Sequence, residues 1–122
     1  MRVFKTKAFA RWARVEGLGD ATLAFAVAEM ERGLIDVKLG GQVVKKRVAI
    51  PGRGKRGSTR MVIAYRQGDK AFFIFGFAKN VRDSINAMEL QALKLLARSL
   101  LSYPPAALAA AVIAGELIEI EV

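Results

Sequence analysis

The sequence predicts an α+β fold in which a small antiparallel sheet carries an N-terminal helical hairpin and C-terminal helices on one face. Apolar residues recur at helical spacing near both ends of the chain. Between them, three runs of alternating side chains are separated by turn residues, which is typical of a β-meander. With 122 residues, 53% of them hydrophobic, the chain is sized for one domain over residues 1–122 with a substantial core.

The first third of the chain predicts one strand and two helices. Residues 2–6 form the strand, and the helix that follows it ends at Gly17. The apolar side of this helix consists of Phe9, Trp12 and Ala13. Asp20 is placed to cap the second helix and Gly33 to end it, so the pair forms a helical hairpin. The apolar side of the second helix consists of Leu23, Val27, Met30 and Leu34.

The middle of the chain predicts the meander. Residues 34–42 form a connection, and a first strand follows at residues 43–50. The second strand spans residues 60–66 and the third residues 70–77, with a tight hairpin turn at Gly68–Asp69. The third strand is rich in Phe. Its alternation favours packing in the core over stacking of nucleobases.

The last third predicts two helices and a terminal segment. Asn86 with Glu89 three residues later matches a capping box at the start of the first helix. The apolar side of this helix consists of Leu93, Leu96, Ala97 and Leu100. Pro104–Pro105 ends it and opens a short Ala-rich helix, which Gly115 closes. Residues 117–122 form either an edge strand or a flexible tail.

The composition excludes several kinds of chemistry. The chain has no Cys and no His, so disulfides, zinc sites built from the usual ligands and Ser-His-Asp hydrolysis are excluded. We expect no cofactor and no metal. No apolar run is long enough to span a bilayer, and the first residues lack the apolar stretch of a secretory signal. We therefore expect a cytoplasmic protein without a membrane partner.

The charge is strongly positive and concentrated in one region. The net charge is +9, and no acidic residue lies between Lys45 and Arg60. The basic residues of this region are Lys45, Lys46, Arg47, Arg53, Lys55, Arg56 and Arg60. After Ser99 there is no basic residue. Such segregation favours a polyanionic partner, nucleic acid first, over an evenly solvated basic surface.

Alternation along the strands places cations on a common face. Lys45 and Arg47 share one face of their strand, which we expect to point away from the helices. Arg60 shares a face of the next strand with small residues, while Tyr65 points into the core. Such a face suits a phosphodiester, because cations stabilise the charge that builds on phosphate in the transition state. Binding of phosphate without cleavage remains the alternative.

RNA carries its own nucleophile, the 2′-hydroxyl, so cleavage requires neither metal nor His. A lysine among arginines is favoured in its neutral form, because like charges repel, and a neutral amine accepts a proton. The loop at residues 51–58 does not match a phosphate-binding P-loop, since Arg56 follows Lys55 where Ser or Thr is needed. It is either a loop that contacts RNA or a solvated hairpin loop.

Three segments together resemble the RelE/HigB toxins of bacterial type II toxin-antitoxin systems, within the RelE/ParE superfamily. They are VVKKRV at residues 43–48, GSTRMV at 57–62 and FGFAKNVR at 75–82. Further likeness to a basic branch of the superfamily extends over nearly the whole chain, at residues 4–13, 39–41, 51–57 and 114–119. The resemblance implies a RelE-like fold and metal-independent cleavage of mRNA on the ribosome by 2′-hydroxyl attack, which inhibits translation.

The resemblance also implies roles for individual residues. Lys45 and Arg47 would supply the general base and a phosphate contact, and Arg60 would stabilise the transition state. The corner after the third strand would complete the catalytic site with Lys79, Asn80 and Arg82. The remaining cations of the basic region would bind RNA: Lys46, Arg53, Lys55 and Arg56.

The chain departs from the family's pattern at two positions. Asn80 stands where that pattern has a further arginine, and Asn86 lies near the position of its active-site tyrosine. The residue that protonates the leaving group is therefore not identified by the resemblance.

The family implies a cognate antitoxin, which we expect to be a helix-turn-helix protein encoded by the adjacent gene. The ribosome and mRNA are the other expected partners. The helix at residues 105–114 either docks the antitoxin or packs in the core. Two alternative functions stay open: a ParE-like poison of DNA gyrase, and a basic RNA-binding module without activity.

Overall fold

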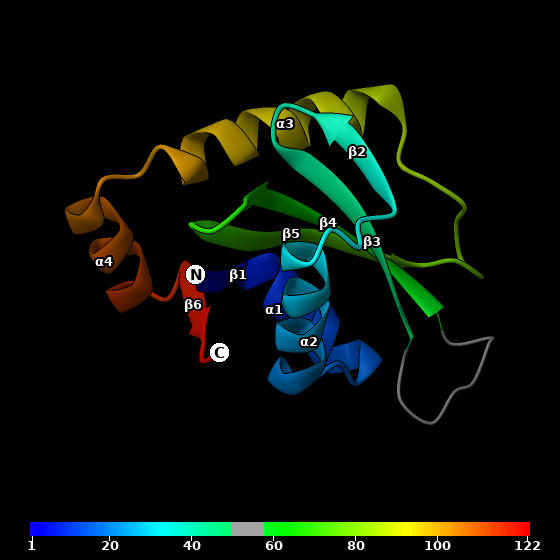
Figure 1. Ribbon diagram of the computed structural model, residues 1–122, viewed down its shortest axis with the longest axis horizontal. Helices are drawn as coiled ribbons and strands as arrows, with labels where there is room; N and C mark the ends of the chain where they lie inside the picture. Colours follow the sequence, from blue (N-terminus) through cyan, green and yellow to red (C-terminus); the bar gives the residue numbers. More distant parts are fainter. Residues whose placement is uncertain (50–57) are drawn as a thin grey trace.

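The computed structural model describes residues 1–49 and 58–122 and contains one six-stranded sheet with helices on both sides (Figure 1). The strands are β1 (Arg2–Thr6), β2 (Val37–Gly40), β3 (Val43–Ala49), β4 (Ser58–Arg66), β5 (Lys70–Ala78) and β6 (Leu117–Ile120). The helices are α1 (Lys7–Glu16), α2 (Asp20–Glu31), α3 (Ala87–Leu101) and α4 (Pro105–Ile113). The predicted α+β class is confirmed.

The sheet has the strand order β2-β3-β4-β5-β1-β6. The predicted meander is confirmed, because β3, β4 and β5 pair antiparallel in sequence. The N-terminal strand β1 then pairs parallel with β5, and the C-terminal strand β6 pairs antiparallel with β1. The last segment is therefore an edge strand, which Arg2 and Glu119 join to β1 through an ion pair of 2.9 Å.

The helices cover opposite faces of the sheet, so the prediction that they share one face is wrong. Figure 1 shows α3 above the strands and α1 and α2 below them. The α1 and α2 side buries Met61 and Ile63 of β4, whereas the α3 and α4 side buries Val62 and Ala64 of the same strand. The reason is that the central strands carry apolar side chains on both faces, and helices must pack on each face to remove these side chains from water.

The N-terminal hairpin is confirmed, with two local differences. Gly19, not Asp20, is the N-cap of α2, and Asp20 begins the helix and pairs with Lys5 at 2.6 Å. Leu34 lies beyond the end of α2 and is half-exposed, because the chain turns at Gly33, whose φ is +89°. An αL residue at this position ends a helix.

The connection predicted at residues 34–42 contains a strand, β2, which forms a hairpin with β3. Its four residues are too few and too exposed to show an alternating pattern in the sequence. The turn of this hairpin places Gly40, Gly41 and Gln42 at positive φ.

The two C-terminal helices are confirmed, but Leu96, predicted on the apolar side of α3, is exposed. Asn86 and Glu89 form the capping box of α3, and Pro105 opens α4. The helix α4 packs on the core through Leu108 and Ala111 while Ile113 is exposed. Among the described residues no single helix is long and apolar enough to cross a membrane, and α3 and α4 meet that test only as a pair bent by 111°.

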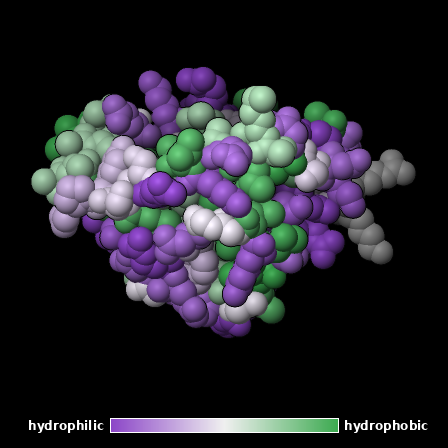
Figure 2. Space-filling view, turned by 90° about the horizontal axis from the view of Figure 1, so that it is seen from above, coloured by the Kyte–Doolittle hydropathy of each residue, from purple (hydrophilic) through white to green (hydrophobic). Residues whose placement is uncertain are grey.

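Figure 2 looks onto the α3 side of the molecule. Hydrophilic residues surround the apolar ones on this face, so it presents no uniform apolar surface. The exposed apolar side chains of α3 are Met88, Leu95 and Leu96. Three cations of the sheet, Lys45, Arg47 and Arg60, lie on this α3 face and are described next.

Candidate functional site

The end of β3, the beginning of β4 and the end of β5 lie side by side because neighbouring strands of the meander run antiparallel. This brings together five cations that are far apart in the sequence. We call this group the cationic end of the sheet, and it consists of Lys45, Arg47, Arg60, Lys79 and Arg82.

Arg47 and Arg60 are direct cross-strand partners, and Lys45 is the partner of Val62. The side chains of Lys45, Arg47 and Arg60 therefore project from the same face of the sheet. Directly opposed Cβ atoms lie about 5 Å apart, and positions two apart on a strand lie about 7 Å apart. These spacings bring three cations within reach of one phosphate group.

The face on which these cations lie is the α3 face, so the prediction that they point away from the helices is wrong. Val43 and Val62 on the same face are buried beneath α3 and α4. The cations follow at the edge of that apolar area. On β4, the apolar residues Ala64 and Val62 of this face are thus followed by the cation Arg60 toward the start of the strand.

Arg60 is half-buried and has no carboxylate partner within the described part of the chain. Its Nη1 donates to Ser58 Oγ at 3.3 Å and to the Thr59 carbonyl at 3.5 Å. These contacts hold the guanidinium near β4 but do not neutralise it. Lys45 is also half-buried and, across residues 1–49 and 58–122, pairs with no acid. Both cations are therefore available to an anion.

Arg47 is more exposed and lies near one carboxylate. Its backbone N–H donates to Asp36 Oδ2 at 2.6 Å, while Nη2 lies 3.9 Å from Asp36 Oδ1. The side chain remains largely in solvent, so this ion pair is weak. Asp36 was not anticipated from the sequence, because the strand β2 that places it there was not predicted.

Lys46 lies on the opposite face of β3, apart from the other cations. It is only 6% exposed and its Nζ lies 3.2 Å from Glu29 of α2. A buried ammonium requires such a partner. The expected contact of Lys46 with RNA conflicts with this position, and we remove the residue from the candidate site.

The corner after β5 is held to the start of α3 by Arg82. Its Nη1 donates to Glu89 Oε2 at 3.0 Å, Nη2 forms a second short bond with Glu89, and Nε donates to the Ser84 carbonyl at 3.0 Å. The guanidinium also lies 5.8 and 5.6 Å from the ring centres of Phe75 and Phe77. Arg82 thus uses its guanidinium for contacts within the chain. This favours a role in positioning the corner after β5.

The Arg82–Glu89 pair also explains a shifted ionisation. The hydrogen bond from Arg82, helped by the Asn86 backbone N–H, lowers the pKa of Glu89, and the carboxylate in turn raises the pKa of Arg82. Glu89 thus serves the capping box and the corner at once. The spacing of Asn86 and Glu89 in the sequence predicted the capping box. The ion pair of Glu89 with Arg82 depends on a tertiary contact and was not predicted.

Lys79 and Asn80 occupy an exposed turn directly after β5. The turn is closed by N–H bonds from Val81 and Arg82 to the Ala78 carbonyl, at 3.0 and 3.2 Å. Ala78 pairs with Thr59, so this turn lies beside the beginning of β4. Arg53, Lys55 and Arg56 fall outside the described residues, and their expected RNA contacts stay predictions.

Neither of the two tyrosines of the chain belongs to the cationic end. Tyr65 points into the core as predicted and donates a hydrogen bond to Glu31, and burial, with that contact, raises the pKa of its phenol. Tyr103 follows α3 and packs on the core between α3 and α4. Asn86 is occupied as the cap of α3.

The cationic end can bind and polarise a phosphate. Within residues 1–49 and 58–122, no group of three or more acidic side chains is arranged to hold an ion. All five cations were predicted from the sequence, but their ion pairs with Asp36 and Glu89 were not.

Comparison with known proteins gives one family. The model of the RelE toxin of the RelE/RelB toxin-antitoxin system matches residues 1–120. No protein of curated function matches the chain.

Proposed function

The chain belongs to the RelE toxin family and is thus the toxin of a toxin-antitoxin system, and we propose that it cleaves mRNA on the ribosome by 2′-hydroxyl attack. Toxins of this family are generally translation-dependent endoribonucleases. One observation carries the proposal for this chain. Lys45, Arg47 and Arg60 project together from one face, and neither Lys45 nor Arg60 has a carboxylate partner in the described chain.

The proposed reaction uses the cations in two ways. Arg47 and Arg60 donate to the non-bridging oxygens of the scissile phosphate and stabilise the added negative charge of the transition state. An arginine cannot act as the base, because its guanidinium remains protonated. Lys45 is therefore the proposed base that accepts the proton of the 2′-hydroxyl.

The 2′-oxygen then forms a bond to phosphorus while the bond from phosphorus to the 5′-oxygen breaks. The products are a 2′,3′-cyclic phosphate and a 5′-hydroxyl end. The leaving 5′-oxygen takes a proton from water, since neither tyrosine lies at this end of the sheet. Lys79 and Asn80 would contact the neighbouring nucleotides from the exposed turn beside β4.

The family implies a RelB-type antitoxin as partner. We propose that it is an acidic or mixed-charge helix-turn-helix protein from the adjacent gene. Such a protein would neutralise the cationic end or dock elsewhere and block access to the ribosome. Copurification of the two gene products tests the pairing, and a chain that never copurifies with its neighbour would contradict it.

Induced expression of the chain in growing bacteria tests the toxin activity and its target. We expect growth to stop with cleaved mRNA, and Arg60→Ala to relieve the arrest. Arrest with intact mRNA and inhibited DNA supercoiling would instead indicate a gyrase poison. Salt-sensitive RNA binding without cleavage on translating ribosomes would indicate a module that only binds.

A further inference from the structure

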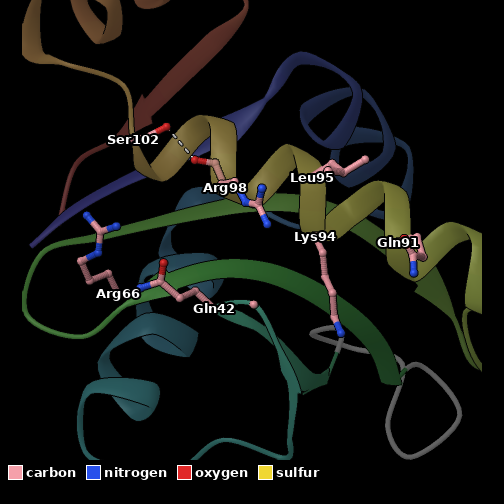
Figure 3. Close-up of a pocket in the computed structure, with 8 residues that line it drawn as sticks. Gln42, Arg66, Gln91, Lys94, Leu95, Arg98 and Ser102 are labelled. Atoms are coloured by element: carbon pink, nitrogen blue, oxygen red, sulfur yellow. Dashed lines mark hydrogen bonds between the residues drawn. The ribbon is translucent and has the colours of Figure 1, made fainter.

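A cationic pocket lies beneath α3 and shares no residue with the proposed cleavage site (Figure 3). It has a volume of about 390 Å³ and opens between α3 and the turn that joins β2 to β3. We call it the α3 pocket. It is lined by Gly41, Gln42, Arg66, Gln91, Lys94, Leu95, Arg98 and Ser102.

Two cations of the α3 pocket have no acidic partner. Lys94 and Arg98 stand four residues apart on α3, and within the described part of the chain neither pairs with a carboxylate. Like charges at this spacing on a helix repel each other, so the pair favours an anion bound between them. Figure 3 shows both side chains directed toward the strands, where Arg66 lies across the gap.

The pocket is built to hold these cations in place. Gly41 has a φ of +60°, and a Cβ added there would lie 3.3 Å from Lys94 Cγ, so the absence of a side chain lets the lysine stem lie along the turn. Arg66 is held through Nη1, which donates to Asp69 Oδ2 and to the Leu101 carbonyl, both at 3.2 Å. Its Nη2 and Nε form no hydrogen bond with the described residues.

The helix α3 joins the pocket to the proposed cleavage site on one face of the sheet. Its first turn is bound to the cationic end by Arg82 and Glu89, and its last residue accepts from Arg66. A rise of 1.5 Å per residue places Lys94 and Arg98 about 8–14 Å beyond Glu89 along the helix. A single strand of a few nucleotides covers this distance.

From this arrangement we propose that the α3 pocket binds a backbone phosphate of the same RNA strand whose scissile phosphate lies at the cationic end. The choice of RNA rests on the proposed function. A basic protein partner fits less well, because the three cations of the pocket would repel it. Three cations with two glutamines suit a phosphate and its sugar.

The test measures binding of single-stranded RNA by two matched variants of the full chain. One variant carries Lys94→Gln and Arg98→Gln. The control carries Lys7→Gln and Arg11→Gln, two exposed cations of α1 with the same spacing, on the opposite face of the sheet and without an acidic partner in the described chain. Both variants lose two charges, so the comparison separates a site from net charge.

We expect the α3 variant to bind an RNA of about 12 nucleotides about five- to tenfold more weakly. The salt dependence should fall by about 0.7 in its logarithmic slope, which corresponds to one lost phosphate contact. An RNA of about 2 nucleotides should bind almost unchanged, because its single linking phosphate reaches only the cationic end. Equal losses in the two variants, or no loss in either, would overturn the proposal.

Two further outcomes keep this proposal distinct from the proposed function. If the α3 variant binds RNA normally but loses the antitoxin, the pocket takes an acidic protein segment and the proposal is wrong. If the unsubstituted chain leaves mRNA on ribosomes intact while the α3 variant still loses RNA affinity, the pocket stands and the nuclease proposal fails.

Discussion

Arg47 of β3 and Arg60 of β4 stand directly opposite each other across two paired strands, on the same face of the sheet. Like charges in this position destabilise a sheet. Arg60 gains two hydrogen bonds from its own strand, to Ser58 and Thr59, and Arg47 gains only a loose ion pair with Asp36. An unfavourable pair at this place supports the proposal that the two cations bind a phosphate.

Replacement of Arg60 by Gln separates stability from activity. We expect the free energy of unfolding to stay equal or rise by about 0.2–1 kcal/mol, because the repulsion from Arg47 disappears. Cleavage should fall about 100- to 1000-fold, because one donor to the transition state is lost. Urea unfolding and mRNA cleavage on ribosomes measure the two effects. Arg14→Gln, at an exposed position of α1, is the control and should leave cleavage unchanged.

Lys45 is the only one of the three proposed catalytic cations that can lose its proton in a protein. Lys45→Arg keeps the positive charge but removes the base, so we expect RNA binding to persist while cleavage falls about 100-fold or more. Binding is measured with a labelled single-stranded RNA and cleavage on translating ribosomes. Retained cleavage in Lys45→Arg would show that Lys45 acts as a charge and not as a base.

The Arg82–Glu89 pair makes stability depend on pH. The pKa of Glu89 is lowered in the folded chain, mainly by Arg82, so its contribution is present above the ordinary value of 4.5 and is lost as pH falls through the lowered value. We expect Glu89→Gln, which retains an acceptor for the cap, to be less stable than the unsubstituted chain at pH 7. The difference in Tm should shrink as the pH falls below 4.5 and through the lowered pKa of Glu89. A constant difference across this range would contradict the assignment.

Gly76 of β5 lies against the indole of Trp12, and a Cβ added at this glycine would come within 2.3 Å of the ring. Gly76→Ala should therefore lower the free energy of unfolding by about 1–3 kcal/mol through overpacking. The same substitution should cost less in a Trp12→Leu background, because the smaller side chain leaves room. Urea unfolding of the four proteins checks this, and equal costs in both backgrounds would contradict the contact.

Much of the fold follows from local signals in the sequence. The capping box at Asn86, the proline at the start of α4 and the alternation in β3, β4 and β5 each act over a few residues. The placement of helices on both faces was not predicted, because alternation shows which residues share a face but not which helix covers it. The short strand β2 was not predicted, because its four mostly exposed residues are too few to establish an alternating pattern.

The candidate site was predicted in its composition but only partly in its geometry. The spacing of Lys45 and Arg47 was sufficient to place them on one face, because strand periodicity is fixed. The alignment of Arg60 with Arg47 depends on the register between β3 and β4. Lys46 was assigned to RNA, yet Glu29 of α2 holds it in the core, a contact that no local pattern encodes. The α3 pocket was missed for the same reason, since it forms only where α3 meets a distant turn.

The most direct test of the central claim is the mapping of mRNA ends after the purified chain acts on translating ribosomes. We predict cuts within the message that leave a 2′,3′-cyclic phosphate and a 5′-hydroxyl. The variant that combines Lys45→Ala, Arg47→Ala and Arg60→Ala should fold and make no cuts. Equal cutting by that variant, or intact mRNA with the unsubstituted chain, would contradict the claim that these three cations cleave RNA.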